Sequence, residues 1–147
     1  MTTLQETLLA PGTKPSVVAD CMTLIQQEVK DMSGISGTAI KVAYKSVTTF
    51  AADHVQFTVE SKLPAMVQQL EPYWADFNAS GGSDFGDYLT KNSEDVTGAL
   101  LSVTDAHAAS PTARPVVVKA YKAVRGHAVK HVSAALPRVG ALVQKYA

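Results

Sequence analysis

Apolar residues recur every three or four positions along most of the chain, which is the spacing of one face of an α-helix. Val18, Cys21, Ile25, Val29 and Met32 form the clearest such stripe, and similar stripes follow later in the chain. The short apolar run around residues 116–118 has no alternating partner run with which a sheet could form. The pattern therefore predicts an all-α fold, a compact bundle of about six to eight helices.

Proline, glycine and capping residues set the expected boundaries of the first helices. A short helix over residues 4–10 should stop at Pro11, and Pro15 suits the first turn of a second helix. Gly34 is the residue type favoured just past a helix C-terminus, so the second helix should end before it. A third helix is expected to start near Ser36.

The middle of the chain predicts a long amphipathic helix with interruptions. Asp53 can cap a helix whose apolar stripe extends over residues 55–74. Pro64 removes one backbone hydrogen bond inside this stretch, so a kink or a junction between two helices is expected, and Pro72 is a second interruption. The run Asn78–Ser83 is the clearest loop.

The last third of the chain predicts three further helical segments. A short helix covers residues 84–89, and Ser93 caps the next helix. After a linker at residues 110–115, a long helical region fills the remainder, with interruptions near Gly126 and Pro137.

Two segments of the chain resemble each other. Aligned without gaps, residues 16–47 and 93–124 share the order Ala-Tyr-Lys-x-Val, and Leu-Pro recurs further on in both. We interpret this as an internal repeat of residues 16–74 and 93–147 within one helical domain that spans residues 1–147. Two helical lobes related by a pseudo-two-fold axis are the expected result, each too small to bury its apolar face alone.

Length and cysteine content favour a single domain in a reducing compartment. A chain of 147 residues can bury enough surface for a core without disulfides. Its one cysteine, Cys21, lies in an apolar neighbourhood and suits a small hydrophobic packing role. The N-terminus lacks the features of a signal peptide, and no apolar run is long enough to span a bilayer. We therefore expect a cytoplasmic protein with no transmembrane segment.

The formal net charge of zero conceals a steep gradient along the chain. Residues 1–105 contain all thirteen acids but only six of the thirteen Lys and Arg residues, whereas residues 106–147 contain seven bases and no acid. These seven bases are Arg114, Lys119, Lys122, Arg125, Lys130, Arg138 and Lys145. An asymmetry of this size indicates either an anionic partner or an acidic surface of the same chain.

The basic C-terminal helix is the first candidate site, through Lys119, Lys122, Lys130 and Arg138. A basic amphipathic helix can dock on an acidic protein, lie on an anionic membrane or contact nucleic-acid phosphates. The simpler interpretation is that this face is the solvated outer side of a bundle helix. It could also pack against the acidic stretch at residues 71–105 of the same chain. Interleaved exposed aromatics and a domain-wide positive charge, both typical of nucleic-acid binding, are absent.

Aromatic residues on both sides of the Gly-Gly loop form the second candidate site. They could line a pocket with acidic anchors, or simply seal a helix–loop–helix corner. The pocket would be made by Tyr73, Trp74, Phe77, Asp84, Phe85 and Tyr88.

Sequence signatures of metal, cofactor or catalytic sites do not rise above background. His127 and His131 are spaced for one helix face, but no third ligand lies nearby in sequence. We therefore expect no metal site, no cofactor and no catalytic residue.

Over nearly its full length the chain resembles an uncharacterised bacterial family of short helical proteins. The resemblance rests on residues 33–37, 70–77 and 84–89 and on the end from Lys119 to Arg138. It implies one compact helical domain in a cytoplasmic setting, and it carries no known activity, ligand or partner. The leading hypothesis is a non-enzymatic binding or protein-interaction domain. The alternative is nucleic-acid or anionic-surface binding through the basic helix, and a small-molecule enzyme using the aromatic corner ranks third.

Overall fold

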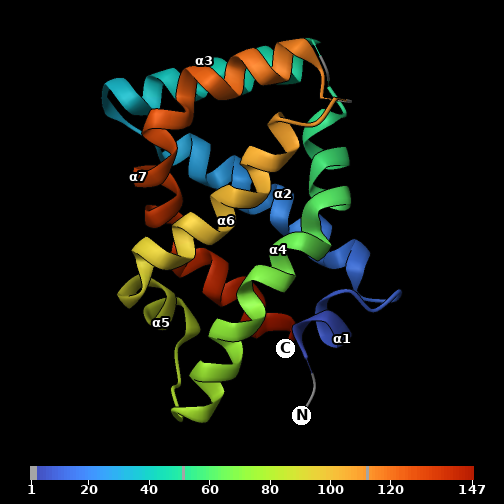
Figure 1. Cartoon of the computed structure of the whole chain (residues 1–147), viewed down its shortest axis with the longest axis vertical. Helices are drawn as coiled ribbons and strands as arrows, with labels where there is room; N and C mark the ends of the chain where they lie inside the picture. Colours follow the sequence, from blue (N-terminus) through green and yellow to red (C-terminus); the bar gives the residue numbers. More distant parts are fainter. Residues whose placement is uncertain (1–2, 51, 112) are drawn as a thin grey trace.

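A computed structural model describes residues 3–50, 52–111 and 113–147, and within these ranges the protein consists of seven helices and no strand (Figure 1). The all-α bundle predicted from the apolar spacing is thus confirmed. The helices are α1 Leu4–Leu8, α2 Lys14–Asp31, α3 Gly34–Phe50, α4 His54–Ala79, α5 Phe85–Lys91, α6 Ser93–Ala108 and α7 Pro115–Tyr146.

Capping residues, proline and glycine mark several of the helix boundaries. The Asp84 side chain accepts a hydrogen bond from the backbone N–H of Asp87 and so caps α5, and Pro15 lies in the first turn of α2. Between α2 and α3 the chain turns at Gly34, whose φ of +76° is a conformation that favours glycine. Asp53 precedes α4 as predicted, but its side chain makes no capping hydrogen bond.

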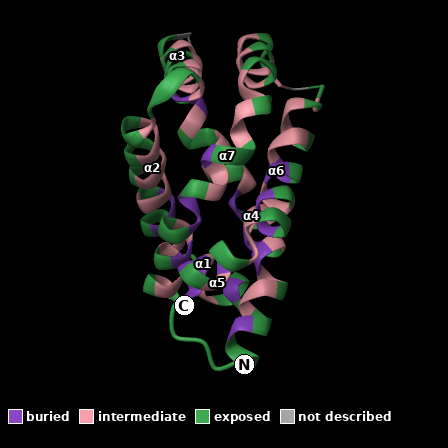
Figure 2. Ribbon diagram, turned by 90° about the vertical axis from the view of Figure 1, so that its left-hand side faces the viewer, coloured by how far each residue is buried: buried purple, intermediate pink, exposed green. Residues whose placement is uncertain are grey.

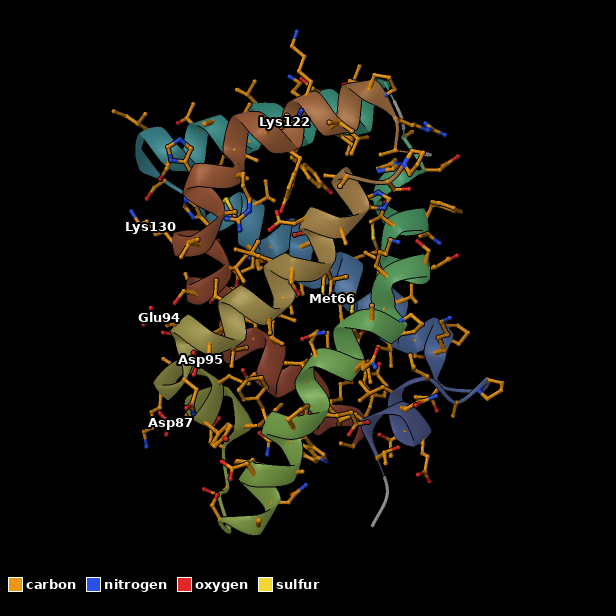
Figure 3. The ribbon with its side chains drawn as sticks, viewed as in Figure 1. Met66, Asp87, Glu94, Asp95, Lys122 and Lys130 are labelled. Atoms are coloured by element: carbon orange, nitrogen blue, oxygen red, sulfur yellow. The ribbon has the colours of Figure 1, made fainter. Side chains whose placement is uncertain are left out.

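The two long helices differ from the predicted interruptions. α4 continues without a break through Pro64 and Pro72, and α7 continues through Gly126 and Pro137. Both helices do bend, a kink being one of the two outcomes expected for α4, and the sharpest bend of α7 lies between the labelled residues Lys122 and Lys130, the segment that contains Gly126 (Figures 1 and 3). A proline removes only one hydrogen bond, and packing of a long amphipathic face can offset that loss.

The buried core occupies the body of the bundle, away from α3 (Figure 2). Its members come from every helix except α3, and no described α3 side chain belongs to it. They are Leu4, Leu8, Val17, Val18, Leu63, Val67, Leu70, Phe77, Phe85, Leu89, Val96, Leu136 and Val143. Cys21 packs half-buried against this core, and burial raises the pKa of its thiol to about 11, so the thiol is protonated at neutral pH.

The contact between α5 and α7 closes the bundle opposite α3. A Cβ placed on Gly140 would lie 2.2 Å from the backbone of Gly86, so the two helices approach each other backbone to backbone. Gln144 of α7 fixes the junction by accepting a hydrogen bond from the backbone N–H of Phe85 and donating one to the carbonyl of Ser83.

Candidate functional site

A two-helix layer covers one end of the molecule. It consists of α3 and residues 115–130 of α7, which lie side by side and run in opposite directions (Figures 1 and 2). The hydrogen bond between Ser36 Oγ and His131 Nε2, 3.1 Å long, holds the start of α3 against α7. We call this unit the basic layer, because neither helix contains an acidic residue.

Five lysines of the basic layer are exposed and form no ion pair with any described acid. Two come from α3 and three from α7, and Lys130 lies beyond the bend, at the edge of the layer (Figure 3). They are Lys41, Lys45, Lys119, Lys122 and Lys130. Figure 3 places Lys122 at the end formed by the layer, whereas Asp87, Glu94 and Asp95 lie toward the opposite end of the molecule.

The other cations of α7 are used inside the fold. Arg125 makes a bidentate contact with Asp105 of α6, at 2.8 and 3.1 Å. Hydrogen bonding to Arg125, with a second bond from Tyr121, holds the pKa of the Asp105 carboxyl below its usual value. Arg125 is therefore engaged within the fold by a carboxylate of α6.

Near the other end of α7, Arg138 bridges two acids of α2. Its guanidinium donates to Glu28 at 2.9 Å and to Asp31 at 2.7 Å. Lys145 pairs with Asp20 of α2 at 2.8 Å. Of the four predicted contact residues, Lys119, Lys122 and Lys130 thus belong to the unpaired set, whereas Arg138 lies outside the layer and is already engaged.

Large apolar side chains are exposed at the same end of the molecule. Ile35 and Val42 on α3 are 89% and 62% exposed, Val129 on α7 is 51% exposed, and Phe57 in the first turns of α4 is 62% exposed. These are the large hydrophobic side chains that the described surface exposes. Ile35 and Val42 are seven residues apart and so share one face of α3.

A shallow hollow of about 260 Å³ lies on the same helix, lined by Val42, Lys45, Ser46 and Thr49. A second, open hollow of about 370 Å³ lies between α2 and α7, where Glu28, Asp31 and Arg138 form part of its wall. Within this wall Arg138 pairs with both acids, and Lys130, which has no ion pair with a described acid, also lines the hollow.

The predicted aromatic pocket is occupied by its own rings. Phe85 and Phe77 are buried, and Trp74 meets Phe85 edge-on with ring centroids 5.0 Å apart. Tyr88 stacks on Phe85, and Tyr73 packs half-buried against the core. The predicted residues do come together, but their rings fill the corner, and the two hollows lie elsewhere.

The acids of this corner also have structural partners. The Tyr88 hydroxyl donates to Asp76, and this bond together with burial raises the pKa of Tyr88 to about 12. Asp84 is occupied as the cap of α5. Both carboxylates therefore have hydrogen-bond partners within the protein, and no ligand is needed to explain their positions.

Sequence reasoning missed the part of the layer that α3 contributes. A signal was present, since residues 32–52 contain two lysines and no acid. It was overlooked because charge was counted along the chain, and only the fold brings α3 beside α7.

None of the described helices is long and apolar enough to span a bilayer. No curated protein and no solved structure matches the chain significantly. A sequence family does match, over residues 4–147. Because the match covers nearly the whole chain, the protein belongs to DUF6918, a family of unknown function.

Proposed function

We propose that the protein is a non-enzymatic binding domain that recognises an anionic partner through its basic layer. One observation carries the proposal: five exposed lysines lie on two acid-free helices with no described acid within ion-pair distance, although three other cations of α7 have such partners. Like charges gathered on one surface repel each other, and an anionic partner removes that repulsion.

The packing of the layer supports the same proposal. α3 supplies no described side chain to the buried core, while Ile35 and Val42 face solvent. Apolar side chains grouped among unpaired charges are typical of interaction surfaces. The aromatic corner offers weaker support for a binding site, because its rings already contact one another.

Retention on a heparin column tests whether the layer binds anions. The double variant Lys119→Gln/Lys122→Gln should elute at lower salt than the wild type, because each removed charge weakens a screened electrostatic contact. The control Lys14→Gln/Lys91→Gln removes the same net charge from α2 and α5 and should elute close to the wild type. Equal shifts in the two variants, or a wild type that is not retained at low salt, would contradict the proposal.

A further inference from the structure

We propose that the anionic partner is a membrane surface, against which the basic layer lies flat with its exposed aliphatic side chains inserted between the headgroups. This inference rests on the proposed function and names the partner. It follows from the kinds of side chain that the layer exposes and from the shape of the surface that carries them.

The exposed face combines lysines with protruding aliphatics. On α3, residues 35, 38, 42, 45 and 49 form one exposed stripe, in which Ile35 and Val42 alternate with Thr38 and Lys45. On α7, exposed Lys119 and Lys122 precede Val129 and Lys130. Lysine stems can cover apolar surface while their ammonium groups reach phosphates, so this mixture suits a lipid interface.

The shape of the surface argues against a helical peptide as the partner. An amphipathic helix anchors its side chains in a groove. The hollow on α3 is open and lined from α3 alone, and Ile35, at 89% exposure, stands clear of its neighbours rather than lining a wall. A protruding side chain inserts into a soft surface more readily than it packs against a rigid one.

The chemistry of the layer argues against nucleic acid. Its one arginine, Arg125, is held by Asp105 and so is not free to contact phosphate or base edges. The described aromatic side chains of the layer, Tyr44 and Tyr121, are half-buried, so they offer no stacking platform. If the layer bound a nucleic-acid phosphate backbone, the side chains of Ile35 and Val42 would stay exposed to water, whereas a bilayer would bury them.

A symmetric dimer through this face is also disfavoured. A two-fold contact would place the five lysines of one copy against the five lysines of the other, with no acid of α3 or α7 to separate them. Like charges brought together in an interface oppose association.

Vesicle co-sedimentation of the full chain tests the inference. The wild type should bind vesicles of phosphatidylcholine mixed with phosphatidylglycerol and should not bind vesicles of phosphatidylcholine alone. Lys119→Gln/Lys122→Gln should weaken binding about 25-fold, since each lysine near an anionic bilayer contributes about fivefold. Lys14→Gln/Lys91→Gln should bind like the wild type.

The aliphatic side chains give the readout that separates a membrane from other polyanions. Ile35→Ser should weaken vesicle binding by about tenfold because an inserted apolar side chain is lost, and Ile35→Leu should restore it. Neither change should alter heparin elution. Because Ile35 is exposed, both variants are expected to fold, which their circular dichroism spectra would verify.

The outcomes separate the two proposals. Heparin retention that depends on Lys119 and Lys122, without binding to anionic vesicles, would leave the proposed function intact and overturn the membrane inference. Vesicle binding that is unchanged by Ile35→Ser would also overturn the membrane inference. So would a lysine-dependent complex with duplex DNA that is tighter than binding to anionic vesicles. Absence of both heparin and vesicle binding would remove both proposals.

Discussion

Single glycines determine how closely helices approach in this protein. At Gly140 an added Cβ would lie 2.2 Å from the backbone of Gly86 and 2.7 Å from that of Phe85. A clash with backbone atoms cannot be relieved by a change of side-chain rotamer. At Gly98, an exposed position of α6, nothing lies within 4 Å of an added Cβ.

These two glycines give opposite predictions for the same substitution. Gly140→Ala should lower the free energy of unfolding by about 3 kcal/mol, because α5 and α7 must separate. Gly98→Ala should raise it by roughly 0.5–1 kcal/mol through helix propensity. Urea denaturation at neutral pH measures both, and a Gly140→Ala variant as stable as the wild type would contradict the close packing described for α5 and α7.

Histidines mark the junctions between elements around the basic layer. His54 at the start of α4 is buried, and its ring lies 5.7 Å from that of His107 near the end of α6. Burial lowers the pKa of both, helped at His54 by the charges of His107 and Arg114 and at His107 by that of Lys62. His131 of α7 is also buried, and burial and then Lys130 lower its pKa.

The lowered pKa values of these histidines predict that the free energy of unfolding falls with pH before the carboxylates begin to titrate. Because the three pKa values are lower in the folded chain than the ordinary 6.5, the unfolded chain binds more protons once the pH falls below about 6.5. The free energy of unfolding should therefore decrease from pH 7 to pH 5. Denaturation at several pH values measures this slope.

A variant with His54→Gln and His107→Gln should show a shallower decrease over the same range. An unchanged slope in the double variant would rule out the pair as its source.

At the scale of the whole molecule, the charge and the packing are both unevenly distributed. The core lies in the body, where α5 and the second half of α7 meet, and the basic layer lies at the other end with half-buried apolar side chains (Figure 2). Segments with few buried contacts open at a lower free energy than the core does. We therefore expect the end proposed to bind to open at a lower free energy than the core.

Native-state hydrogen exchange should reveal this difference. Backbone amides of residues 40–47 in α3 should exchange about tenfold faster, or more, than those of residues 136–143 in α7. Equal protection in the two segments would mean that the layer is as firmly packed as the core.

The internal repeat stays a prediction. If it is correct, each copy contributes one helix to the basic layer.

Much of the fold follows from local rules. Amphipathic spacing predicted the helices, and Pro15, Gly34 and Asp84 marked their limits. The predicted interruptions at Pro72 and Pro137 were wrong, because long apolar faces pack continuously across them. Sequence gives the sites of lost hydrogen bonds but not the tertiary packing that offsets the loss.

By itself the sequence determined that the chain is helical and that its last 42 residues carry bases without acids, since both are properties of neighbouring positions. Only the tertiary structure decided which bases remain unpaired. Arg138 meets acids 107 and 110 positions away, and α3 joins α7 from across the chain. Ion pairing and ring packing depend on distances in space, so the full extent of the basic layer and the filled aromatic corner became visible only once the helices were assembled.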